Sequence, residues 1–400
     1  MAATLDAKEE HMGKVLISGA SIAGPALAYW LNRYGFDVTV VEKAATIRGG
    51  GYPVDIRGSA LEVVRRMGVH RALEQAHVDS RRISFLDPDG GLIAAIDPQR
   101  LTGGAQARDL EVRRGDLTEA LYGAVRDDVE FLFGDSIAAL DDRADGVEVT
   151  FRGGTRRVFD VVVGADGLHS HTRGLVFGPE ERFHRYLGYC FAGFTMPNHL
   201  GLSHEGVIWN VPGRAAALYA VGEGDTVHGF LNFSLDEPPF HAFRDPAAQR
   251  ELVASTFAGD GWEIPRLVAA MRTADDLFFD VVSQIRMPRW SSGRVALVGD
   301  AAAAPSFLTG QGTSVALVGA YVLARELANR PGHAAAFDAY ERRTRGFAEL
   351  NQALVSEGDA ALFPRTAEAL ARRDAMVRGL TALPSHERPE HSAITLDDVA

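Results

Sequence analysis

The stretch from residue 294 to 324 restricts the fold of this chain more than any other part of its sequence. Its first residues, RVALV, predict a buried strand, and a long apolar helix is expected from about residue 313. Between them, Gly310 and Gly312 let the backbone approach a ligand closely, and free N–H groups at a helix start attract negative oxygens. Asp300, just after the strand, is suited to accept hydrogen bonds from sugar hydroxyls. The stretch indicates a phosphate-bearing ligand, with an ordinary strand–loop–helix unit as the alternative.

A second unit of this kind lies near the N-terminus. Residues 14–18 and 37–41 are short apolar runs that predict buried strands, and a helix is expected between them. The segment Gly19-Ala20-Ser21-Ile22-Ala23-Gly24 joins the first strand to that helix, and Glu42 ends the second strand. This pattern predicts a dinucleotide site, with a tight glycine turn, a pyrophosphate at the helix start and a carboxylate on the ribose. Ser21 replaces the middle glycine of the fingerprint, so a plain strand–turn–helix connection is the alternative.

The composition excludes several classes of protein. The chain has 400 residues and a formal net charge of −12, which argues against a nucleic-acid-binding surface. Its one cysteine, Cys190, permits neither an intramolecular disulfide nor a cysteine-based metal cluster. The histidines lack the spacing of metal ligands, so no metal is expected. No apolar run is long enough to span a membrane and no signal peptide is recognisable, so we expect a cytoplasmic protein without membrane contact.

The order of the predicted elements indicates an α/β chain with two interleaved domains. Strands that alternate with helices predict a Rossmann-like domain, whereas aromatic strand-like runs after residue 180 predict an inserted antiparallel sheet. Helices are expected toward the C-terminus. The predicted boundaries are 13–76, 111–178 and 287–331 for the Rossmann-like domain, 77–110 and 179–286 for the inserted domain, 332–384 for the C-terminal helices, and 1–12 and 385–400 for loose termini.

Three motifs occur together, in a fixed order. They are the Gly19 to Gly24 turn with Glu42, then Asp166-Gly167-x-x-Ser170-x-x-Arg173, and then Gly299-Asp300-Ala301-Ala302 with Gly310-Gln311-Gly312. The set resembles the single-component, class A flavoprotein monooxygenases, which include aromatic-ring hydroxylases and the tetracycline- and rifampicin-modifying enzymes. The resemblance covers residues 14 to about 350. It implies a Rossmann-like FAD-binding domain with an inserted substrate domain and one non-covalently bound FAD.

The resemblance also implies which residues contact FAD. Glu42 resembles the carboxylate on the adenosine ribose, Arg114 the arginine at the pyrophosphate, and Asp300 the residue that binds the ribityl chain. An arginine suits the pyrophosphate because its planar fork matches phosphate oxygens, and the neighbouring Arg113 is an alternative for this role. The full set of implied FAD contacts is Gly19, Ser21, Gly24, Glu42, Lys43, Asp55, Arg114, Asp166, Asp300, Gly312, Thr313 and Ser314.

The implied reaction is oxygen transfer from a flavin to a small molecule. NADPH or NADH reduces FAD, oxygen adds at flavin carbon 4a, and the hydroperoxide passes one oxygen atom to the substrate by hydroxylation or Baeyer–Villiger oxidation. Ala303 stands where the family commonly has histidine, so the catalytic acid or base is unknown.

An aromatic or polycyclic substrate is expected between the flavin and the aromatic-rich sheet, in natural-product biosynthesis or antibiotic inactivation. Both a monomer and a homodimer are compatible with the sequence. The residues expected to contact the substrate are Phe194, Trp209, Tyr219, Phe230, Asn232 and Phe307.

Three alternative functions are compatible with such a fold. A flavin-dependent halogenase needs a catalytic lysine well after the first strand–helix–strand unit, but no lysine follows Lys43. The tryptophan signature of halogenases is also only half met, since Asp260 precedes Trp262 where a second tryptophan would stand. A flavin dehydrogenase or reductase, and a non-catalytic protein that binds flavin or another ligand, both stay open.

Overall fold

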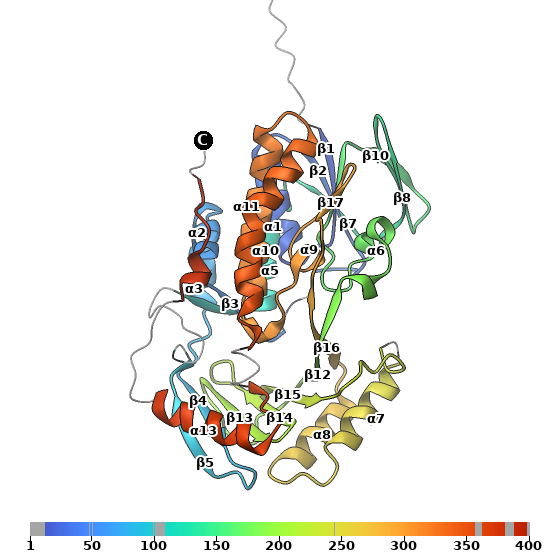
Figure 1. The fold of residues 1–400 in the computed structure, drawn as a ribbon. Coiled ribbons are helices and arrows are strands. Elements are labelled where there is room, and N and C mark those ends of the chain that lie inside the picture. The colour runs from blue at the N-terminus through green and yellow to red at the C-terminus, as the bar shows by residue number, and fades with distance from the viewer. Residues whose placement is uncertain are drawn as a thin grey trace, which may run out of the picture.

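The computed structural model describes residues 13–47, 49, 51–98, 100, 109–243, 245–356, 362–380 and 388–397. Its upper and lower bodies in Figure 1 are joined by the long strands β12 (His184–Pro197) and β16 (Phe278–Ile285). The upper body contains a mostly parallel sheet, and the lower body contains a mostly antiparallel sheet. These sheets confirm the predicted α/β fold class, a Rossmann-like domain with an inserted antiparallel-sheet domain. The N-terminal segment predicted to be loose, 1–12, lies outside the described residues.

A six-stranded sheet forms the centre of the upper body. Its order is β17-β18-β11-β1-β2-β7, and only β17 runs antiparallel to its neighbour. Side chains alternate along each strand, so Val15 and Ile17 pack against helices while Leu16 packs under a three-stranded sheet, β10-β9-β8. The strands of the two sheets are β1 (Lys14–Ser18), β2 (Asp37–Glu42), β7 (Glu130–Phe133), β8 (Ile137–Arg143), β9 (Gly146–Phe151), β10 (Arg156–Phe159), β11 (Val161–Gly164), β17 (Ser291–Ser292) and β18 (Val295–Leu297).

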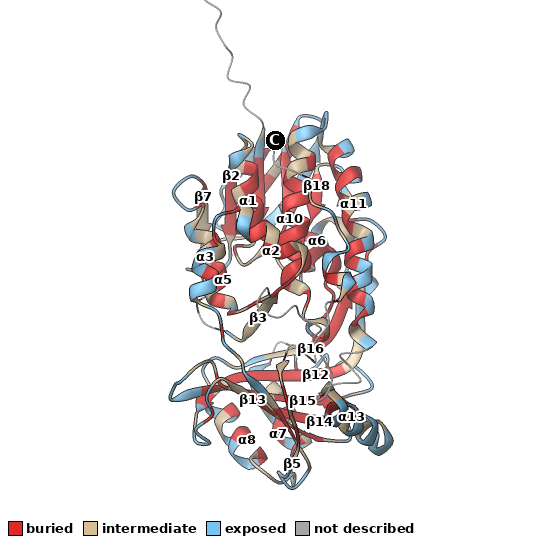
Figure 2. Ribbon diagram, turned by 90° about the vertical axis from the view of Figure 1, so that its left-hand side faces the viewer, coloured by how far each residue is buried: buried red, intermediate tan, exposed pale blue. Residues whose placement is uncertain are grey.

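The helix α10 (Gly312–Asn329) lies at the centre of the upper body and is buried along most of its length, as Figure 2 shows. Small and apolar residues on all its sides let it pack between α1 (Ala23–Arg33) and α11 (His333–Ala353). The chain enters α1 from β1 and approaches α10 from β18, and both strands end at the same edge of the parallel sheet. The two glycine-rich helix starts therefore lie at one edge, where such folds bind their ligands.

Short elements surround this edge of the sheet. The two-stranded ribbon of β3 (Pro53–Ile56) and β6 (Leu110–Arg113) is antiparallel and leads into α5 (Arg114–Gly123). The remaining short elements of the upper body are α2 (Ser59–Arg66), α3 (His70–Gln75), α6 (His171–Phe177), α9 (Asp300–Ala303), and the 3-10 turns η1 (Glu180–Arg182) and η2 (Phe307–Thr309).

The lower body is built on a seven-stranded sheet in the order β16-β12-β15-β14-β13-β4-β5. All neighbours are antiparallel except β13 and β4, which are parallel. One face, here called the outer face, packs against α7 (Pro246–Thr256) and α8 (Ile264–Thr273), away from the upper body. The inner face is the opposite one. The strands not yet given are β4 (Arg82–Leu86), β5 (Leu92–Ile96), β13 (Glu205–Val211), β14 (Arg214–Tyr219) and β15 (Thr226–Ser234).

The C-terminal helices pack on different bodies. Whereas α11 packs on α10, α13 (Ala367–Leu380) packs on β5 and β13 of the lower sheet (Figure 1). The described part of the predicted loose tail, 388–397, differs from the prediction because it lies against the upper body and contains the turn η3 (Pro389–Ser392). Ile394 and Leu396 pack on the core there, and Asp397 pairs with Arg343 at 2.6 Å. The short sequence of this tail gave no sign of these partners, which come from distant parts of the chain.

Candidate functional site

The first glycine motif forms a turn that only glycine fits. A Cβ atom on Gly24 would lie 1.9 Å from the carbonyl oxygen of Gly19, and a Cβ on Gly19 would lie 2.5 Å from that of Ala165. Gly19 also has a positive φ of 110°. The turn therefore packs directly on the segment that carries Asp166. The N–H groups of Gly19 and Ala20 are bonded to Val41 and Glu42, whereas those from Ser21 to the start of α1 form a cradle suited to a pyrophosphate.

Ser21, the departure from the glycine fingerprint, has a partner in the structure. The guanidinium of Arg114 donates a hydrogen bond of 2.9 Å to the Ser21 hydroxyl. The backbone N–H of Arg114 also donates to the carbonyl of Tyr52, at 3.2 Å. The first motif and the start of α5 thus meet, and a cation lies at the phosphate cradle. Arg113 points elsewhere and pairs with Asp116 at 2.9 Å.

Glu42 ends β2 beside this cradle. One carboxylate oxygen accepts the N–H of Ala20 and the other accepts the N–H of Ala44, both at 2.9 Å. These bonds fix the carboxylate at the carboxyl end of the strand, where a ribose would lie in a dinucleotide site. Lys43, beside it, is exposed.

Asp300 begins α9 and lies against the start of α10. Its carboxylate oxygen is 3.7 Å from the position that a Cβ on Gly312 would take. Burial raises the pKa of Asp300, and the charge of Arg114 acts in the opposite direction. No described residue donates a hydrogen bond to its carboxylate. An acceptor in such a place suits hydroxyl donors of a ligand.

Gln311 gives the clearest sign that a ligand belongs at the start of α10. Its side chain is 1% exposed, yet neither its amide oxygen nor its amide nitrogen has a hydrogen-bond partner among the described residues. Buried amides without partners are rare because they lose the hydrogen bonds of water. Thr313 and Ser314 are also buried here, and Ser314 accepts the N–H of Arg57 at 3.3 Å. The unpartnered amide, the glycine cradle and the Asp300 carboxylate together fit FAD.

Asp55 lies next to the same helix start. Its carboxylate is 3.1 Å from the position of a Cβ on Gly310, and it pairs with Arg57 at 2.8 Å. Glu111 lies directly opposite Asp55 in the β3–β6 ribbon. Sequence reasoning missed Glu111 and the amide of Gln311. The sequence showed Gln311 within its glycine motif, whereas the only sign of Glu111 was its position three residues before Arg114.

Asp166 and Arg173 have internal partners. Asp166 accepts hydrogen bonds from the Ser170 hydroxyl and from the N–H and hydroxyl of Thr172, so it caps α6. Arg173 is fully buried and donates to the carbonyls of Leu168 and Ala301. This arginine links the second motif to the third, beyond fixing its own turn.

The inner face of the lower sheet contacts the segments that surround this site. The ring centroids of Phe230 and Tyr52 are 6.3 Å apart, and those of Phe191 and Phe307 are 4.8 Å apart. Tyr219 donates a hydrogen bond of 2.6 Å to Glu111. Asn232 is paired in register with Phe191, is 6% exposed, and its amide makes no hydrogen bond to a described residue.

Two of the substrate candidates lie on the other face of the sheet. Phe194 and Trp209 belong to the core cluster under α7 and α8, and Trp209 stacks on Trp262 at 6.3 Å. Side chains alternate between faces along a strand, so these two rings point away from the upper body. Tyr219, Phe230, Asn232 and Phe307 are the four candidates that the structure brings together on the inner side.

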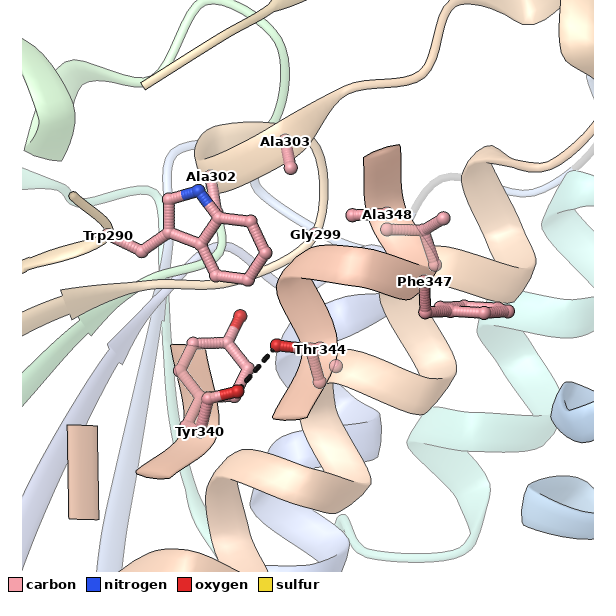
Figure 3. Close-up of a pocket in the computed structure, with 10 residues that line it drawn as sticks. Trp290, Gly299, Ala302, Ala303, Tyr340, Thr344, Phe347 and Ala348 are labelled. Atoms are coloured by element: carbon pink, nitrogen blue, oxygen red, sulfur yellow. Dashed lines mark hydrogen bonds between the residues drawn. The ribbon is translucent and has the colours of Figure 1, made fainter. Parts of the chain in front are cut away.

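Two cavities lie behind α9. The smaller, of about 10 Å³, is lined by residues that include Trp290, Ala302, Ala303 and Tyr340, and Figure 3 shows it beside the Thr344–Tyr340 hydrogen bond. It has room for about one water molecule. The larger, of about 200 Å³, also adjoins Ala303 and lies between residues 285–287, at the end of β16, and α11. Ala303 therefore borders these cavities.

Neither a metal centre nor a membrane span is found in the part of the chain that the structure describes. No cluster of three or more histidine, cysteine, aspartate or glutamate side chains could hold a metal ion there. Within those residues, no helix is both long and apolar enough to cross a membrane.

Comparisons with known proteins agree with this geometry. Residues 12–186 match the family model described as an FAD binding domain. A flavin-dependent monooxygenase of an unknown prokaryotic organism is 37% identical over 389 residues, covering 95% of this chain and 100% of the relative. The uncharacterized protein Rv1260 of Mycobacterium tuberculosis is 45% identical over 348 residues, covering 86% and 93%. The solved tetracycline destructase Tet(55) is 35% identical with a TM-score of 0.84, covering 98% of this chain and all of that one. With a flavin monooxygenase matched along nearly its whole length, the chain belongs to the class A, FAD-dependent monooxygenases.

Proposed function

We propose that this protein uses FAD, NADPH or NADH, and O₂ to oxygenate an aromatic or polycyclic small molecule, by hydroxylation or Baeyer–Villiger oxidation. The observation that carries the proposal is the contact between the aromatic inner face and the segments around the FAD site. Phe230 meets Tyr52 there, and Phe191 meets Phe307. An aromatic wall next to a flavin is suited to hold a flat substrate and to exclude water.

The chain's own residues bind and orient the reactants. The turn at Gly19 and Gly24, with Arg114, would hold the pyrophosphate, while Glu42 would bind the adenosine ribose. Asp300 would accept hydrogen bonds from the ribityl hydroxyls, and the N–H groups from Gly312 to Ser314 would face the flavin ring. FAD, when bound, supplies the redox chemistry that moves one oxygen atom from O₂ to the substrate.

A tetracycline-like polycycle is the substrate class we propose. The similarity to tetracycline destructase Tet(55) supports this class, as does the aromatic inner face. Asn232 is 6% exposed on this face, and its amide would donate to or accept from a polar group of the substrate. The role fits an apolar site in which a few polar groups fix the orientation of a ligand.

The proposal predicts a yellow protein that releases free FAD on heating, one per chain. It further predicts that a tetracycline accelerates NADPH or NADH oxidation and gains one oxygen atom from labelled O₂, as measured by mass spectrometry. Peroxide formed without labelled product would instead indicate a flavin oxidase or reductase of the same fold. A colourless protein that cannot be reconstituted with FAD would contradict the proposal altogether.

A matched pair of phenylalanines tests which face of the sheet contacts the substrate. We expect Phe230→Ala to raise the KM for the best polycyclic substrate roughly tenfold, since a lost aromatic contact is worth about 1.5 kcal/mol. We expect Phe194→Ala, in the outer core, to lower the free energy of unfolding by about 3 kcal/mol with little change in KM. Steady-state kinetics and thermal unfolding of both variants provide the measurement. Equal KM changes in the two variants would remove the inner face from the substrate site.

A further inference from the structure

Glu111 lies where the upper and lower bodies meet, and neither the motifs nor the expected FAD contacts include it. Its β6 strand pairs with β3 so that Glu111 and Asp55 are direct cross-strand partners. Partners of this kind in an antiparallel pair point to the same face, with Cβ atoms about 5 Å apart. Two carboxylates therefore lie side by side, next to the start of α10 at Gly310.

The groups around Glu111 favour a proton on one of the two carboxylates. From β3 and the residues after it, Asp55 adds a negative charge, and Arg57, paired with Asp55 at 2.8 Å, adds a positive one. Burial and then the charge of Asp55 raise the pKa of Glu111 to about 7, whereas Arg57 and a hydrogen bond from Tyr219 act to lower it. Two like charges so close cannot both ionise cheaply.

Other elements also face this carboxyl group. From β14 of the lower sheet, the Tyr219 hydroxyl donates to Glu111 at 2.6 Å and also contacts the Ser80 hydroxyl. His77, after α3, contacts the backbone of Glu111 through Nδ1, and Asp109 precedes it on the chain. Burial and the charge of Glu111 raise the pKa of Tyr219, so this phenol stays a donor at every working pH. Of the two carboxyl groups, Glu111 is thus the one whose charge changes near neutrality.

We propose that Glu111 is a positioning residue of the flavin site, held by Tyr219 across the two bodies, and that its ionisation places a second negative charge beside Asp55 and lowers the reduction potential of bound FAD. The inference rests on the proposed FAD site. Negative charge near a flavin disfavours its reduction, because reduction itself adds negative charge to the ring. The hydrogen bond from Tyr219 of the lower body to Glu111 is then linked to the reduction potential of the bound flavin through this one carboxyl group.

The sign of the pH dependence follows from proton linkage. Reduction of the flavin makes the surroundings of Glu111 more negative, so Glu111 binds its proton more tightly in the reduced enzyme. Over the pH range just above 7, reduction therefore takes up one extra proton. The midpoint potential of bound FAD falls more steeply with pH in that range than below it.

The test is the midpoint potential of FAD in the holoenzyme, measured by dye equilibration between pH 5.5 and 9. We expect the wild type to show a steeper segment that begins near pH 7, and Glu111→Gln to show none. Tyr219→Phe removes a bond that lowers the pKa of Glu111, so its steeper segment should begin at higher pH. Glu130→Gln is the matched control, since Glu130 lies on the edge strand β7 and pairs with Arg157 of β10. The midpoint potentials of this variant should follow those of the wild type.

Each outcome decides between the alternatives. Parallel curves for the wild type and Glu111→Gln, in folded holoenzymes, overturn the role of Glu111 while the proposed FAD site stands. If the wild type itself binds no FAD, the proposed function fails first. Should Glu111→Gln not fold, an unshifted steep segment in Tyr219→Phe is by itself enough to overturn the inference.

Discussion

Asp300→Ala is expected to weaken FAD binding roughly tenfold to hundredfold, measured as the Kd for FAD added back to the apoprotein. The carboxylate lies against the start of α10 at Gly312 and accepts no hydrogen bond from a described residue, so ligand hydroxyls are its natural donors. A lost hydrogen bond to a charged group costs about 1.5 to 3 kcal/mol, which corresponds to that change in Kd. We expect the fold to be retained. Burial raises the pKa of Asp300, which means that the folded protein holds this charge at a cost in free energy.

Ala303→His is the matched control within the same short helix. Ala303 borders the cavity of about 200 Å³ behind α9, which offers space for a larger side chain away from the Asp300 carboxylate. We expect the Kd for FAD to change by less than about threefold, well below 1.4 kcal/mol. Equal losses of affinity in the two variants would show that α9 acts through its shape, and the role of Asp300 would then be wrong.

Gly24→Ala is expected to have the second large effect, on folding as well as on FAD. The added methyl group would lie 1.9 Å from the Gly19 carbonyl oxygen, so the turn that forms the phosphate cradle must open. Because φ of Gly24 is not positive, the clash alone is tested. Overpacking of this kind lowers the free energy of unfolding by about 3 kcal/mol, and FAD binding should be lost with the turn.

Gly123→Ala provides the control for the same chemical change. Gly123 lies at the end of α5, and outside its own helix and chain neighbours no atom is within 4 Å of the position its Cβ would take. Here the methyl group should stabilise the protein by up to about 1 kcal/mol, because alanine loses less conformational freedom than glycine in a helix. Thermal unfolding of both variants, with and without FAD, gives the comparison. A Gly24→Ala protein that melts and binds FAD like the wild type would contradict the close approach of the two glycines.

The sequence by itself determined the fold class and the family. Apolar runs that end at Gly19 and Gly299 predicted buried parallel strands with ligand-binding turns, since only a buried strand tolerates such a run and only glycine fits such a turn. The separation of these motifs along the chain predicted a discontinuous domain. These features are local, so a single stretch of sequence carries each of them.

Only the tertiary structure decided which side chains meet. The partners Arg114 and Ser21 are far apart in the sequence, and their contact depends on how α5 packs beside α1 within the upper body. The contact between Tyr219 and Glu111 depends on how the two bodies are placed. The direction of each aromatic ring depended on strand register. Phe230 faces Tyr52, beside the FAD site, and Phe194 faces the core under α7 and α8, although both lie in apolar strands. A shift of one residue reverses the face of a strand, and the sequence alone left that register open.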